Sequence, residues 1–91
     1  MKSNASRIIE VIQEASDDAI IADGFDDALI GHTTHWDMIP ETTAVYSVEK
    51  VLQILMERDG MTDEEALEFF YFNIGGAWMG KQTPIFVWTE E

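Results

Sequence analysis

Cysteine is absent from this sequence, and no apolar run in it is long. The lack of cysteine rules out a disulfide-based fold, thiol catalysis and cysteine-ligated zinc. No stretch approaches the roughly 18 consecutive apolar residues of a membrane-spanning helix. Glu10, Gln13 and Glu14 interrupt the apolar residues near the N-terminus, so no secretory signal is expected. These absences predict a soluble, cytoplasmic protein.

Basic residues are scarce, with 5 Lys and Arg against 18 Asp and Glu, which gives a formal net charge of −13. Phosphate backbones and anionic lipid surfaces repel such a chain. Direct nucleic-acid binding and membrane binding are therefore disfavoured, whereas a basic protein partner would be attracted. The alternative interpretation is that the acidic residues only keep an aromatic-rich domain soluble.

The 91 residues, of which 46% are hydrophobic, suffice for one core and one domain, covering 1–91. Within it we expect an N-terminal helical region, 1–20, and an α+β core, 21–88. The helix is predicted from Asn4 to about Ala15, because Ile8, Val11 and Ile12 recur at helical spacing. Since this apolar stripe is narrow, we expect the helix to lie at the edge of the domain.

Two β-strands are predicted next. The first starts at Phe25 and extends to about Trp36, with Gly31 marking a bulge or a close backbone approach, and the second covers Thr43 to Tyr46. Because only about six residues separate them, they should pair as an antiparallel hairpin.

Two helices should follow, with clear signals at their ends. Ser47 is a natural N-cap for the first, and Gly60 suits its left-handed C-terminus. Thr62 and Glu65 form the T-x-x-E pattern of a capping box at the start of the second.

The second of these helices, predicted over Asp63 to Met79, is apolar around most of its circumference. We therefore expect it to be buried on both sides, either as the central element or at an interface, with a local break or a close crossing at Gly75-Gly76. A final short strand is predicted at 83–88, and residues 89–91 should be disordered. The fold class is thus α+β: a three-stranded antiparallel or mixed sheet packed against a helical hairpin, in the order α-β-β-α-α-β.

Three segments carry a resemblance to known sequences: DGFDDALIG at 23–31, VYSVEKVLQILMERDGMTDEEALEFFYFN at 45–73 and GAWMGKQTPIFV at 76–87. Together they resemble a family of small, uncharacterised, acidic bacteriophage proteins. The first 20 residues lie outside the resemblance. It implies a phage or prophage origin and a shared fold, in a protein that acts in the host bacterial cytoplasm, but it implies no activity and no catalytic residues.

A metal site is one hypothesis for the run from His32 to Asp37. His32, His35 and Asp37 have the ligand chemistry for zinc or another divalent ion. On a continuous strand, however, His32 and His35 point to opposite faces, so the site requires a loop to begin between them. Hydrogen-bonded histidines without metal are the favoured interpretation, and no cofactor is predicted.

The acidic clusters do not indicate catalysis. Asp23, Asp26 and Asp27 lack the spacing of a calcium loop and suit a turn. Glu64 and Glu68 share a helical face at i, i+4, in an exposed position that does not suit acid–base catalysis. Since no nucleophile elbow, phosphate loop or dinucleotide motif is present, we do not expect an enzyme.

Aromatic side chains are abundant for so small a fold, and some are expected to form an interaction surface. The main hypothesis is a non-enzymatic protein that binds a basic protein partner as an inhibitor or DNA mimic. Its rivals are a metal-binding module or metal-dependent enzyme, and a homodimer that buries the aromatic helix. The expected partner-binding residues are Trp36, Tyr71, Trp88, Glu64 and Glu68.

Overall fold

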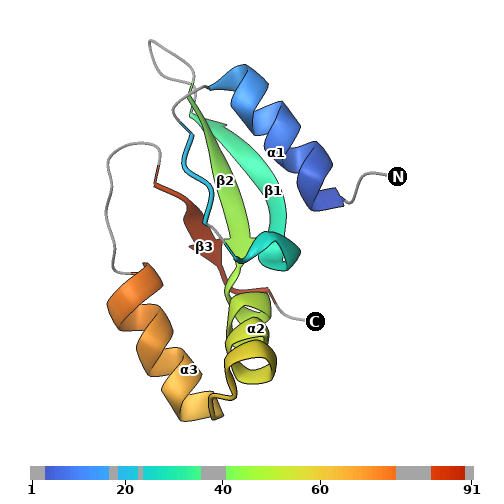
Figure 1. The fold of residues 1–91 in the computed structure, drawn as a ribbon. Coiled ribbons are helices and arrows are strands. Elements are labelled where there is room, and N and C mark those ends of the chain that lie inside the picture. Colours follow the sequence, from blue (N-terminus) through green and yellow to red (C-terminus); the bar gives the residue numbers. More distant parts are fainter. Residues whose placement is uncertain (1–3, 17–18, 23, 36–40, 76–82, 90–91) are drawn as a thin grey trace.

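The computed structural model describes residues 4–16, 19–22, 24–35, 41–75 and 83–89. A three-stranded sheet and three α-helices form a compact α+β fold in the predicted order α-β-β-α-α-β (Figure 1). The α+β fold class is confirmed. The helical elements are α1 (Asn4–Ala15), the 3-10 turn η1 (Asp26–Ala28), α2 (Val48–Asp59), α3 (Asp63–Phe69) and the π-helix η2 (Phe70–Gly75), and the strands are β1 (Leu29–His35), β2 (Glu41–Ser47) and β3 (Ile85–Val87).

The sheet is mixed, with β2 in the centre. β1 and β2 form the predicted antiparallel hairpin, and the register shifts between Leu29 and Gly31, where a bulge was expected. β3 runs parallel to β2, with Tyr46 opposite Phe86. A parallel pair requires a long crossover connection, and α2, α3 and η2 lie within it.

The first strand is shorter than predicted at its N-terminal end. Residues Asp26 to Ala28 form the 3-10 turn η1, in which the Ala28 N–H donates to the Phe25 carbonyl at 2.9 Å. Consecutive aspartates favour such local turns over a strand. The second strand is longer than predicted, from Glu41 to Ser47, because its ends pair fully with β1 and β3.

Helix α1 has the predicted bounds and packs against β1 and β2 (Figure 1). Ile12 is completely buried, and Ile8 and Ile9 pack around it. Because Ile12 belongs to the same buried cluster as the sheet residues Ala44 and Tyr46, α1 contributes to the core and does not lie only at the domain edge.

The helical hairpin of α2 and α3 continues directly from the end of β2 (Figure 1). The Ser47 hydroxyl accepts from the Lys50 N–H at 3.3 Å, and Gly60 ends α2 with a φ of +71°. Thr62 and Glu65 form both hydrogen bonds of the capping box. The three cap signals identified in the sequence are therefore confirmed.

Tyr46 on β2 contacts β3 and the segment after α1, and through Phe86 it is linked to η2. Its side chain is fully buried and stacks on Phe86 with 5.5 Å between ring centroids. Phe86 meets Phe70 edge-on at 5.3 Å, which joins β3 to η2. The Tyr46 hydroxyl accepts a hydrogen bond from the Ala22 N–H at 2.8 Å, which fixes the segment after α1 against the sheet.

The segment that follows β3 is held by a carboxylate. The backbone N–H of Thr89 donates to Glu49 Oε1 at 2.6 Å, its hydroxyl donates to the same oxygen at 3.0 Å, and it lies 3.1 Å from the Ser47 hydroxyl. The prediction of disorder is wrong for Thr89, because Glu49, 40 positions away in the first turn of α2, binds it, and residues 90 and 91 lie outside the described residues.

We expect Tyr46→Phe to lower the free energy of unfolding by roughly 1–3 kcal/mol, since it leaves the Ala22 N–H without this acceptor. Urea denaturation measures the effect. Tyr71→Phe is the matched control, because Tyr71 is 55% exposed, and it should stay within about 0.5 kcal/mol of the wild type. Equal effects of the two substitutions would contradict the role given to the Tyr46 hydroxyl.

Glu49→Gln should lower the melting temperature at neutral pH and have little effect in acid. The Thr89 backbone N–H lowers the pKa of Glu49 from its ordinary value of 4.5. A lowered folded-state pKa stabilises the protein above the unfolded value, and this contribution disappears as the pH falls through the folded value. Thermal melts at neutral pH and at about pH 3 test this. Glu14→Gln removes the same charge at an exposed position on α1. It should show no such pH-dependent difference in melting temperature.

Candidate functional site

The aromatic helix is exposed on one side, so the prediction that it is a central element buried on both sides within this chain is wrong, whereas its burial at an interface stays a prediction. Between residues 63 and 74 only Ala66 and Phe70 are fully buried. Phe72 is 81% exposed and Tyr71 55% exposed, while Leu67 and Phe69 are each more than one-third exposed. Helix α3 lies with α2 beyond the end of β2 (Figure 1). The sheet therefore does not cover the side of α3 that carries the exposed rings.

The helix also changes type at the aromatic run. Residues Phe70 to Gly75 form a π-helix in place of the α-helix predicted to Met79, of which 76–79 lie outside the described residues. The Asn73 side-chain amide donates to the Phe69 carbonyl at 3.2 Å within this segment. A π-helical turn holds more residues than an α-helical turn, so side chains beyond Phe70 leave the 3.6-residue pattern used to predict burial.

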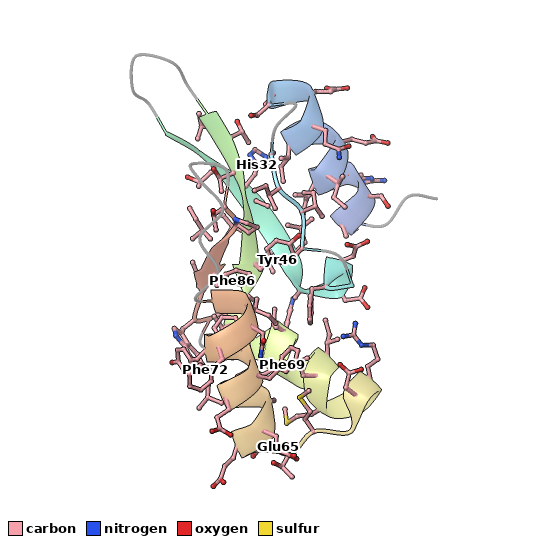
Figure 2. The ribbon with its side chains drawn as sticks, turned by 60° about the vertical axis from the view of Figure 1, so that its left-hand side comes forward. His32, Tyr46, Glu65, Phe69, Phe72 and Phe86 are labelled. Carbon is pink, nitrogen blue, oxygen red and sulfur yellow. The ribbon has the colours of Figure 1, made fainter. Side chains whose placement is uncertain are left out.

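An open groove of about 420 Å³ runs along the exposed side of α3 and η2. Figure 2 shows Glu65, Phe69 and Phe72 on this helical segment. We call the exposed side of the segment the α3 surface, defined by Glu64, Glu65, Glu68, Phe69, Tyr71 and Phe72. The groove within it is lined by Met61, Glu65, Glu68, Phe69, Phe72 and Asn73.

Glu65 is fixed at the start of this surface by the capping box. One oxygen, Oε1, accepts from the Thr62 N–H at 3.0 Å, and the Glu65 N–H donates to the Thr62 hydroxyl at 3.2 Å. The hydrogen bond from the Thr62 backbone lowers the pKa of Glu65, which favours the ionised form of this carboxylate. The α3 surface thus combines fixed negative charge with exposed rings.

The expected partner-binding residues are only partly brought together. Tyr71, Glu64 and Glu68 are all exposed on α3 and η2. Trp88 is 57% exposed, but it follows β3 and does not line the groove. Trp36 lies outside the described residues.

Sequence reasoning missed Glu65, Phe69 and Phe72 as candidate binding residues. The two phenylalanines lay in the helix expected to be buried on both sides, and Glu65 was assigned to a solvated capping end. The spacing of Glu65, Glu68 and Phe72 at i, i+3 and i+7 was the available signal, since it places acids and rings on one helical face.

The histidines do not meet the condition set for a metal site. β1 continues through both His32 and His35, which pair with Ala44 and Glu41, so no loop begins between them. Asp37 lies outside the described residues. Among the residues that are described, no group of three or more histidine and carboxylate side chains is placed to hold a metal ion.

A second groove, of about 470 Å³, lies between η1 and α2 and has a structural explanation. Arg58, which lines it, donates to the Gly24 carbonyl at 2.8 Å, and its guanidinium lies 5.1 Å from the centre of the Phe25 ring. The Asp59 carboxylate accepts from Arg58 at 3.0 Å. This arginine links the end of α2 to the turn before β1.

Comparison with protein-family models, curated proteins and solved structures found no match to this chain. Within the described part of the chain, no helix is long and apolar enough to cross a membrane.

We expect Thr62→Ala to lower the free energy of unfolding by about 1 kcal/mol and to speed amide exchange in α3, because it removes the N-cap acceptor. Urea denaturation and hydrogen exchange provide the measurements. Thr62→Ser keeps a hydroxyl at the same position and should behave like the wild type. If alanine and serine were equivalent, the capping box would not be what orders the start of the α3 surface.

Proposed function

We propose that this protein is a non-enzymatic binding protein that engages a basic surface of a protein partner through the α3 surface. The observation that carries the proposal is Phe72, which is 81% exposed in a groove shared with the carboxylates of Glu65 and Glu68. Exposed aromatic side chains that become buried on association are typical binding hot spots.

The net charge of −13 determines which kind of partner fits this surface. Two copies of the chain repel each other at long range, and so do the chain and a nucleic acid. A basic protein is instead attracted, and its association would be accelerated at low ionic strength. Charge therefore favours a basic partner over a second copy as the molecule that covers Phe72.

The resemblance to small acidic phage proteins extends the proposal to a biological setting. In that setting the protein is a phage or prophage accessory protein in the bacterial cytoplasm, and its partner is a host protein. A basic nucleic-acid-binding site is the natural target for acidic residues, since carboxylates there replace phosphates. Binding at such a site would inhibit the host protein.

Capture from bacterial lysate tests the proposal. The tagged full chain is compared with Phe72→Ala at about 50 mM and about 500 mM salt, which differ strongly in charge screening. We expect a basic protein to be held by the wild type at low salt and released at high salt. Phe72→Ala should weaken its binding by about 30-fold or more, as expected for a hot-spot residue.

Val11→Ala is the matched control, because Val11 is also exposed, at 45%, but lies on α1. It should retain the partner. If the amount of captured protein changed neither with salt nor with Phe72→Ala, binding through the α3 surface would be contradicted. Light scattering on the same samples tests the alternative of a homodimer. If the wild type were a dimer that Phe72→Ala dissociates, the occupant of the α3 surface would be a second copy of the chain and not a basic partner.

A further inference from the structure

We propose that the groove beside α3 receives an arginine side chain of the partner. This inference rests on the proposed function and adds the chemistry of the central contact. It predicts that the protein distinguishes arginine from lysine, which a purely acidic surface does not.

The carboxylates of the groove suit a cation with several donors. Glu65 and Glu68 lie three residues apart on α3 and line the same groove. Oε1 of Glu65 is engaged by the Thr62 N–H, which holds the side chain in place and leaves Oε2 as an acceptor. No hydrogen bond or ion pair of Glu68 is found within the described residues, and a carboxylate can accept two parallel N–H bonds from a planar guanidinium.

The rings of the groove favour guanidinium over ammonium. Phe69 and Phe72 line the same groove as the two glutamates. A guanidinium is planar and weakly hydrated, so it stacks on an aromatic ring while its edge donates to carboxylates. A lysine ammonium is compact and strongly hydrated, and it gains less from such a ring. Asn73 adds an acceptor, because its amide nitrogen is used by the Phe69 carbonyl and its Oδ1 is not.

The open shape of the groove indicates that the arginine belongs to a protein and not to a free small molecule. Sites for free small molecules are concave and bury most of the ligand surface. This groove is open to solvent, and Phe72 is 81% exposed beside it. The surrounding contact must therefore come from the molecule that carries the arginine, which is a protein segment.

The chain already contains one arrangement of this chemistry. The Arg58 guanidinium lies 5.1 Å from the centre of the Phe25 ring and donates two hydrogen bonds to the Asp59 carboxylate, at 3.1 and 3.0 Å. An arginine in the groove would repeat this ring-and-carboxylate combination with groups supplied by α3 and η2.

Titration of the isotope-labelled full chain with nona-arginine and nona-lysine peptides tests the inference, with backbone amide NMR as the readout. At about 50 mM salt, we expect nona-arginine to bind at least about fivefold more tightly. The amide shifts should be concentrated between Met61 and Asn73. Thermal melts confirm that each variant is folded, and the 81% exposure of Phe72 makes its substitution mild.

Three variants separate the groove from general charge. Glu68→Gln and Phe72→Ala should each weaken nona-arginine binding several-fold, and Phe72→Ala should bring the two peptides to similar affinities. Phe72→Tyr keeps the ring and should restore the preference. Glu14→Gln makes the same change of charge on α1 and should weaken both peptides slightly and equally.

Equal affinities of the wild type for the two peptides would overturn the arginine assignment, as would shifts spread over α1, or no binding by either peptide. The lysate experiment remains a separate test of the proposed function, because it requires only that capture of a basic partner depends on Phe72. If capture did not depend on Phe72 while the protein still bound nona-arginine more tightly than nona-lysine, the proposed partner would be refuted and the arginine assignment of the groove would stand.

Discussion

The buried contact between Tyr46 and Phe86 is the interaction on which the other elements depend. It lies where the parallel strands β2 and β3 pair, and it is extended on one side by Phe70 and on the other by the Ala22 N–H. These contacts join segments from residue 22 to residue 86. The same core cluster includes Val48, Val51 and Leu55 of α2, and the contact of Phe70 with Phe86 constrains how η2 lies against the sheet.

That constraint explains the exposed rings. Phe70 is the residue that reaches Phe86, and it therefore sets which side of α3 and η2 faces the core. Phe72, two positions further along, is consequently left in solvent. The anchor that attaches the helix to the sheet thus also creates the α3 surface.

Features set by neighbouring residues could be predicted from the sequence. The caps at Ser47 and Thr62 and the turn at Gly60 depend on a few adjacent residues, and all three were found. Burial of α3 and the order of Thr89 depend on segments distant in sequence, Phe86 and Glu49, and both predictions were wrong. The candidate site was predicted only in part for the same reason: Glu68 was identified from its i, i+4 spacing with Glu64, whereas exposure of Phe72 depends on how the helix meets the sheet.

Acidic residues in general promote solubility. Folding gives additional reasons for two of the three glutamates of α3. Glu64 and Glu65 lie in the first turn, where negative charge is favoured by the helix dipole, and Glu65 also completes the capping box. Glu68 lies beyond that turn, where the dipole has little effect. It has no hydrogen bond or ion pair within the described residues, and it lines a groove with two phenylalanine rings. Glu68 therefore takes part neither in the cap nor in any hydrogen bond or ion pair among the described residues, and it lies beside an exposed ring, which is why the proposed arginine contact includes it.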